Sequence, residues 1–262
     1  MDVDDPVTQY IAVEKEAYDE AARQRPRVAE RQFRPGKQGI WHRRISRLID
    51  WHREGDFDLP VDLVRPYALP VLARVEQRIP LKYQYRGLNA LRELARAHVM
   101  FPEMIAGGTP LKVLDLSAGG CGVADVYGHY GHDVTIRDYF VTGADGMPRN
   151  SYTAIHQELG LECEHFDGRE RPYDFESDSF DLVLCHQALD AYGPVSSWSE
   201  AVGEMLRIAR RSVGLVFNPP YPRTPETEAE AAAFIAKLSA DHVTDEGVCP
   251  DTKLVTLRIE KM

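Results

Sequence analysis

From residue 111 onward, short apolar stretches alternate with stretches of helical spacing. The strand candidates are 112–117, 133–138, 162–167, 180–186, 212–218 and 253–260. Helix candidates occupy 196–211 and 227–240, and Trp198, Val202 and Met205 share a face of the first. Strands that alternate with helices form a mostly parallel sheet with helices on both faces. The pattern therefore predicts an α/β fold with a doubly wound sheet.

The first 110 residues lack strand alternation, and we expect them to be helical. Helices are predicted at about 6–31, at a segment containing Ile40, Ile45, Leu48 and Ile49, at around 67–78 and at 88–97. Proline and glycine at 34–39 are expected to interrupt the chain between the first two. We predict an N-terminal helical cap over 1–105, serving as a substrate lid, and a sheet domain over 106–262.

Composition limits the class of protein. The 262 residues carry a net charge of −10, which disfavours a general nucleic-acid-binding surface. The four cysteines show no paired spacing, and no zinc or other metal is predicted. An acidic N-terminus and the lack of a long apolar stretch predict neither a signal peptide nor a membrane span. We expect a soluble, cytoplasmic protein.

Three of the strand candidates end in an acid. These are Asp115, Asp138 and Asp167. Ligands of a doubly wound sheet bind beyond the carboxyl ends of its strands, and an acid after the second strand can accept the hydroxyls of a ribose. Gly119 lets the backbone approach a ligand, while Tyr139 is placed to pack on a base. The pattern predicts a bound adenosine moiety, with Phe166 as a second ring beside the base.

Adenosine occurs in both nicotinamide dinucleotides and S-adenosylmethionine. A dinucleotide site needs a glycine-rich turn and a helix start that accepts pyrophosphate. Here the nearest register is Gly120-x-Gly122-x-x-Asp125, and an aspartate in the first helical turn would repel pyrophosphate. This argues against a nicotinamide oxidoreductase, which stays an alternative.

Two segments carry a resemblance to a known family. VLDLSAGGCGVA at 113–124, and SFDLVLCHQALDAY at 179–192 followed by EMLRIARR, resemble class I S-adenosylmethionine-dependent methyltransferases of the small-molecule type. The resemblance covers about 111–218. It implies a seven-stranded, Rossmann-like methyltransferase sheet with a late antiparallel strand. It also implies S-adenosyl-L-methionine as cofactor and S-adenosyl-L-homocysteine as product.

The resemblance implies roles for the first loop of the sheet. Asp115 would organise this loop and the methionine amino group, and Gly119 would let the chain pass close to the cofactor. Ser117 and Cys121 stand at positions where the family usually has glycine, and both are small. A non-catalytic, cofactor-binding relative is therefore an alternative.

Further roles follow along the sheet. Asp138 would hold the ribose hydroxyls and Tyr139 would pack on adenine. Asp167, with Gly168 adjacent, would bind the adenine amine. His186 would lie beneath the sulfonium and the acceptor, where an imidazole can act as a general base.

Two residues before the sheet domain are further candidates. Tyr85 or Arg86 could reach the cofactor carboxylate, which a guanidinium binds well. A surface cluster at the start of a helix is the alternative. The basic segment 22–48 raises the hypothesis of an anionic acceptor, with a solvated helix face as the alternative.

The tetrapeptide NPPY at 218–221 offers a rival interpretation. In methyltransferases that act on adenine or glutamine amines, this motif ends the fourth strand. Here 180–186 fills the fourth place and NPPY follows the fifth candidate, 212–218, so we interpret it as coincidental. We predict methyl transfer to a hydroxyl or amine of a small-to-medium acceptor. An NPPY-type enzyme acting on nucleic acid or protein stays the alternative.

Overall fold

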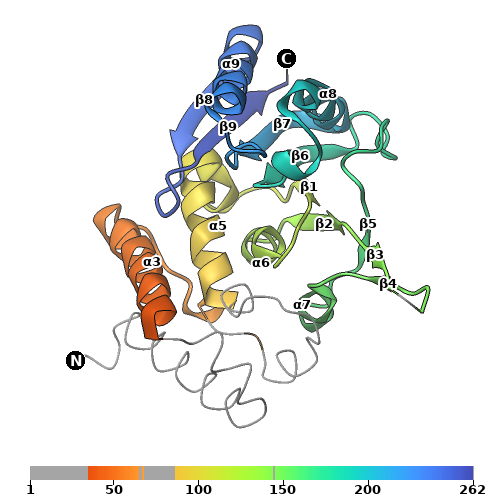
Figure 1. The fold of residues 1–262 in the computed structure, drawn as a ribbon. Helices are drawn as coiled ribbons and strands as arrows, with labels where there is room; N and C mark the ends of the chain where they lie inside the picture. The colour runs from red at the N-terminus through yellow and green to blue at the C-terminus, as the bar shows by residue number, and fades with distance from the viewer. Residues whose placement is uncertain (1–34, 65–66, 68–85, 144, 262) are drawn as a thin grey trace.

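The computed structural model describes residues 35–64, 67, 86–143 and 145–261. Seven strands form one sheet in the order β5-β2-β1-β6-β7-β9-β8 (Figure 1). Their bounds are Lys112–Leu116 (β1), Asp133–Asp138 (β2), Cys163–His165 (β5), Phe180–His186 (β6), Ala209–Val216 (β7), Val243–Val248 (β8) and Val255–Glu260 (β9). The first five in this order are parallel, and β9 is antiparallel to both β7 and β8. The predicted seven-stranded, doubly wound and mostly parallel Rossmann-like sheet, with its late antiparallel strand, is confirmed.

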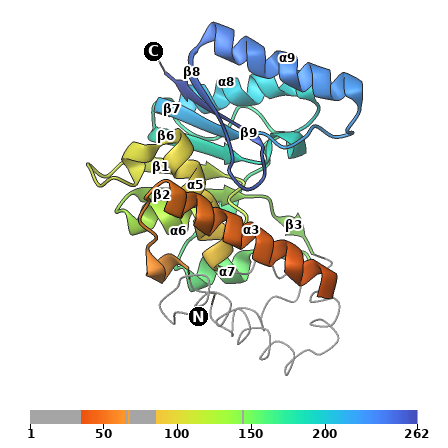
Figure 2. The same cartoon turned by 90° about the vertical axis from the view of Figure 1, so that its left-hand side faces the viewer.

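Helices cover both faces of this sheet (Figures 1 and 2). One face carries α5 and α6, with α3 packed on α5, and the other carries α8 and α9. The helix bounds are Pro35–Glu54 (α3), Arg86–Met100 (α5), Gly122–His129 (α6), Thr153–Glu158 (α7), Trp198–Ile208 (α8) and Pro225–Asp241 (α9). Short 3₁₀ helices lie at Val61–Leu63, Pro102–Met104, Leu189–Ala191 and Val195–Ser197, and strands β3 (Val141–Thr142) and β4 (Pro148–Arg149) form a hairpin.

The central strands are buried on both faces, as their uninterrupted apolar runs predict. Alternate residues of β6 enter two separate cores. Val183 and Cys185 pack with α8 and α9, while Leu182 and Leu184 pack with α5 and α6. Of the seven residues of β6, only His186 is not fully buried. The strand therefore delivers one polar side chain to the carboxyl edge of an apolar sheet.

Several element boundaries and one strand differ from the sequence-based expectation. Helix α3 already includes residues 35–39, the segment expected to interrupt the chain. Helix α8 ends at Ile208, and 209–211, expected to be helical, instead begins β7. The edge strand β8 was not predicted.

Helix α5 confirms the predicted helix at 88–97 and packs directly on the sheet. Leu94, Ala97 and Met100 are buried with residues of β1 and β6. The division into a cap and a sheet domain at 105/106 stays a prediction, and the helices expected at 6–31 and 67–78 fall outside the described residues, except for Tyr67. Within the described part of the chain, no helix is long and apolar enough to cross a membrane.

Candidate functional site

A cavity of about 250 Å³ lies at the carboxyl ends of β1, β6 and β7, with α5 as one wall. The residues that line it are Asn89, Arg92, Glu93, Arg96, Asp115, Ser117, Ala118, Gly119, Gly120, Gly122, Val123, Tyr152, His186, Gln187 and Asn218. Four of the residues predicted from the sequence meet here: Asp115, Ser117, Gly119 and His186. Parallel strands place their carboxyl ends at one edge, which is why residues from distant segments converge.

Asp115 lies one residue before the end of β1 and is 2% exposed. Its Oδ2 atom is buried and has no hydrogen-bond partner among the described residues. Burial raises the pKa of this carboxyl well above its usual value, and the nearby charges of Glu93 and Asp138 raise it further. Because buried polar atoms are nearly always paired, the orphaned oxygen on a cavity wall indicates a place for a ligand donor.

The loop after β1 needs left-handed backbone at three positions. Ser117, Gly119 and Cys121 have φ angles of +63°, +51° and +57°. Only glycine adopts this region without a steric cost, which gives a physical reason for glycine at such positions. At Ser117 the conformation is held in part by a hydrogen bond between its hydroxyl and that of Tyr192, at 2.8 Å.

Asp138 connects the end of β2 to this loop. Its Oδ2 accepts a hydrogen bond from the Gly119 amide at 3.2 Å, and its Oδ1 accepts one from the Tyr139 amide at 2.8 Å. The carboxylate is buried but does not line the cavity. It therefore fixes the backbone of Gly119 and lies next to the cavity, on the side of β2.

Tyr139 and Asp167 lie beyond Asp138 and are joined by Arg169. The guanidinium of Arg169 pairs with the Asp167 carboxylate, holding the pKa of that carboxyl below its usual value. It also lies 5.4 Å from the centre of the exposed Tyr139 ring. Phe166, in contrast, is buried against Tyr173 and Tyr192.

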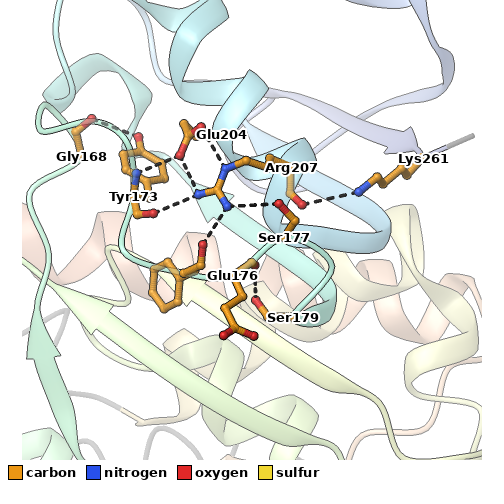
Figure 3. Close-up of polar contacts among 9 residues, drawn as sticks. Gly168, Tyr173, Glu176, Ser177, Ser179, Glu204, Arg207 and Lys261 are labelled. Carbon is orange, nitrogen blue, oxygen red and sulfur yellow. Dashed lines mark hydrogen bonds and ion pairs between the residues drawn. The ribbon is translucent and has the colours of Figure 1, made fainter.

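Gly168 packs against the Tyr192 ring, and a Cβ atom there would lie 2.2 Å from Cδ1 of that ring. Its carbonyl accepts a hydrogen bond from the hydroxyl of Tyr173 at 3.0 Å. Arg207 of α8 holds the same loop, because it donates to the carbonyls of Tyr173 and Phe175 at 2.9 and 2.7 Å (Figure 3). The loop after β5 is thus fastened to α8.

We expect Arg207→Met to lower the free energy of unfolding by about 1–2 kcal/mol, since charged hydrogen bonds are lost but the side chain is partly exposed. Amide hydrogen exchange should rise over 168–177 and not in β1, as measured by mass spectrometry. Arg223→Met removes an exposed arginine paired with Glu228 and serves as control. Unchanged exchange over 168–177 would show that Arg207 does not hold the loop.

His186 at the end of β6 meets Glu93 of α5. The distance between His186 Nδ1 and Glu93 Oε2 is 2.9 Å, and both side chains are at most 10% exposed. Burial favours protonation of Glu93, but the charges of Arg96 and then His186 outweigh it and lower its pKa to about 2. The Nε2 atom of His186 is buried and has no partner among the described residues.

Gln187 and Asn218 form the remaining polar wall. The Gln187 side chain accepts from Arg92 at 2.5 Å and also from Arg96, and it donates to Asn218 Oδ1 at 2.9 Å. The Asn218 amide donates to the Gln187 carbonyl at 2.9 Å and to Asp190 at 3.1 Å. The NPPY tetrapeptide follows β7, and this confirms that it does not end the strand at 180–186, which was counted as the fourth. Asn218 of this tetrapeptide nevertheless lines the cavity.

Arg86 makes a bidentate ion pair with Asp125 of α6, with both N–O distances at 2.7 Å. It does not line the cavity, and Tyr85 falls outside the described residues. The pair also corrects the charge argument against a dinucleotide, because Asp125 is neutralised by Arg86 and would not repel pyrophosphate as an isolated carboxylate would.

The sequence interpretation missed the wall formed by α5. Asn89, Arg92, Glu93 and Arg96 line the cavity, and their spacing places them on one side of a helix. A sequence signal was present, since these polar residues lie within the otherwise apolar predicted helix 88–97. Close packing brings this wall to the loop, because a Cβ at Gly122 would lie 2.6 Å from Glu93 Cγ.

No protein-family model and no curated protein matches the sequence. Solved structures of similar fold include small-molecule methyltransferases. Magnesium protoporphyrin IX methyltransferase from Synechocystis PCC 6803, with bound SAM, has 16% identity and a TM-score of 0.44, covering 74% of this chain and 90% of its own. An amino pentose methyltransferase from Micromonospora echinaspora has 14% identity and a TM-score of 0.44, with coverages of 65% and 91%.

A SAM-dependent methyltransferase from Aquifex aeolicus has 15% identity and a TM-score of 0.41, covering 71% of this chain and 100% of its own. The matched proteins thus share a sheet architecture with this chain.

Proposed function

We propose that this protein transfers a methyl group from S-adenosyl-L-methionine to a hydroxyl or amine of a small-to-medium acceptor. The observation that carries the proposal is the unpartnered, buried Asp115 carboxyl on the cavity wall, beside a loop whose backbone is held by Asp138. A carboxyl at this place suits the ammonium group of the cofactor's methionine part. The donor set therefore fits the cofactor.

The proposal uses the predicted ligands at the ends of β1, β2 and β5, and it gives the carboxylate-binding role expected of Tyr85 or Arg86 to two arginines of α5. Asp115 receives the ammonium, while Arg92 and Arg96 on the opposite wall offer cationic groups for a carboxylate. Asp138 and the exposed ring of Tyr139 lie on the β2 side, where they would hold the ribose and the adenine. Asp167 and Gly168 are proposed to border the adenine beyond Tyr139, with Arg169 attached to that carboxylate.

The cofactor supplies a methyl group already activated by a positive sulfur. The protein's task is then to align the acceptor and to exclude water, and positioning of this kind can lower a barrier by roughly 7–11 kcal/mol. His186 lines the cavity and is the proposed catalytic base. An anionic group on the acceptor stays a prediction, because residues 22–34 of the basic segment on which it was based fall outside the described residues.

Asp115→Asn tests the proposed cofactor site. Titration calorimetry with S-adenosylhomocysteine should show binding to the natural protein and about 10–100-fold weaker binding to the variant, because one charged hydrogen bond contributes about 1.5–3 kcal/mol. Asp245→Asn changes an exposed aspartate of β8 and should leave affinity unchanged. No heat with the natural protein would refute the function.

The binding of S-adenosylhomocysteine should also change the protonation of Asp115. The pKa of Asp115 is raised in the free protein, so its contribution to folding is present at low pH and is lost as pH rises through that raised value. An ammonium ligand favours the ionised form. Binding should therefore release a proton at pH values below the raised pKa, where the free carboxyl is protonated, and buffers of different ionisation enthalpy will report it.

A second candidate is an NPPY-type amine methyltransferase, which is favoured only by the presence of Asn218 at the cavity. However, both the oxygen and the nitrogen of the Asn218 side-chain amide already form hydrogen bonds with Gln187. Asn218→Ala with unchanged turnover would exclude this candidate. A non-catalytic relative would bind S-adenosylmethionine but would methylate no acceptor. A nicotinamide enzyme would bind NADH, and the Asp138→Ala substitution would abolish that binding.

A further inference from the structure

Helix α5 and strand β6 bring together Glu93 and His186, which are 93 positions apart in the chain. Glu93 Oε2 lies 2.9 Å from His186 Nδ1, and Glu93 Oε1 accepts a hydrogen bond from Arg96 Nη1. The side chains of all three residues are at most 10% exposed. The carboxylate is therefore fixed between a permanent cation and an imidazole.

The chemistry of Glu93 determines which nitrogen of His186 carries the proton. The ion pair with Arg96 keeps Glu93 a carboxylate at neutral pH, and a carboxylate can only accept hydrogen bonds. The neutral imidazole must then carry its hydrogen on Nδ1 and its lone pair on Nε2. Nε2 has no hydrogen-bond partner among the described residues, and the imidazole lines the cavity.

We propose that Glu93 is a positioning residue that holds His186 with a free Nε2 lone pair toward the acceptor, and that the acceptor is a hydroxyl compound. The inference rests on the proposed methyl transfer and specifies its substrate class. A neutral amine already has a lone pair for attack. An alcohol or phenol must lose a proton as its oxygen reacts, so a fixed base serves the hydroxyl.

The reaction balances with the groups present in this proposal. The acceptor O–H bond breaks, and its proton goes to His186 Nε2. The oxygen electron pair forms the new bond to the methyl carbon, and the electron pair of the carbon–sulfur bond remains on sulfur. The sulfonium becomes a neutral thioether, and the imidazolium later returns its proton to water. Glu93 stabilises the imidazolium through the hydrogen bond at Nδ1.

Glu93→Gln tests the positioning role with a defined expectation. Arg96 can only donate, so the glutamine should turn its carbonyl toward Arg96 and its NH₂ toward His186 Nδ1. Nδ1 would then accept a hydrogen bond, and Nε2 would carry the proton. Long-range ¹H–¹⁵N NMR of the imidazole should report protonation at Nδ1 in the natural protein and at Nε2 in this variant.

The His186 signals are assigned by their loss in His186→Gln. Glu228→Gln provides the matched control, since Glu228 also pairs with an arginine but lies exposed on α9. This control should leave the His186 tautomer unchanged. A natural protein with its proton on Nε2, or a Glu93→Gln variant with the natural tautomer, would overturn the positioning role without any assay of activity.

Methyl transfer is then assayed with S-adenosylmethionine and paired hydroxyl and amino compounds of the same carbon skeletons. Products of the hydroxyl members support the inference, and Glu93→Gln should lower kcat for them about 10²–10⁴-fold with KM within about twofold. Methylation of the amino members alone, or of none while S-adenosylhomocysteine binds, overturns it. Absence of S-adenosylhomocysteine binding refutes the proposed function, whereas the NMR result still decides the role of Glu93.

Discussion

Replacing Arg96 with methionine is expected to lower the free energy of unfolding by about 3–5 kcal/mol, because a buried ion pair would lose one partner. Arg96 is 3% exposed, and its guanidinium pairs with Glu93. Asp115 is a second carboxyl of the same cavity and already resists ionisation through burial and the charge of Glu93. Removing the cation would leave Glu93 insufficiently compensated in a region of low dielectric.

A double substitution separates charge from packing. Changing Glu93 and Arg96 together to methionine removes both charges, and half or more of the lost stability should return in urea unfolding. A double variant that is less stable than Arg96→Met would contradict the argument.

The free energy of unfolding of the natural protein should also depend on pH through Glu93. Glu93 stabilises the fold above about pH 4.5, and this contribution is lost as pH falls toward about 2.

The sheet was predictable because β1 and β6 are short apolar runs with an acid or a histidine at or next to the last residue. Asp115 lies one residue before the end of β1, while Asp138 and His186 are the last residues of β2 and β6, and parallel pairing places the ends of these strands at one edge. Strand β8 gave no such signal. It contains Asp245, Glu246 and Gly247, which are poor strand residues tolerated because β8 lies at the edge of the sheet and pairs only with β9.

The cavity wall was less predictable than the sheet, because it depends on contacts between distant segments. Periodicity identifies a helix at 88–97, but not that Glu93 will meet His186 across the sheet edge. The sequence also did not show that some predicted ligands pair with charged residues of the protein itself. Asp167 pairs with Arg169 only two residues later, and Arg86 pairs with Asp125, and neither pair was predicted from the sequence. A single sequence does not show which of several oppositely charged residues a side chain will pair with.

The second large effect is expected for Trp198→Ala, with a loss of about 3–5 kcal/mol in the free energy of unfolding. Trp198 is 1% exposed, begins α8 and packs against Phe217 and Phe234 at centroid distances of 6.1 and 5.7 Å. Truncation would open a large cavity beneath the end of β7. Since Phe217 directly precedes Asn218, the loss should extend to the cavity wall and weaken S-adenosylhomocysteine binding in calorimetry.

Two further variants test the origin of this effect. Trp198→Phe keeps an aromatic ring but loses the hydrogen bond from the indole N–H to the Gly193 carbonyl at 3.2 Å, so it should cost less than half as much as alanine. Tyr221→Ala removes a side chain that is 83% exposed, and its unfolding free energy should change by less than about 0.5 kcal/mol. If Trp198→Ala and Tyr221→Ala unfolded at the same urea concentration, the packing of α8 beneath β7 would not support the site, and the polar wall formed by Gln187 and Asn218 would have to be held by its own hydrogen bonds alone.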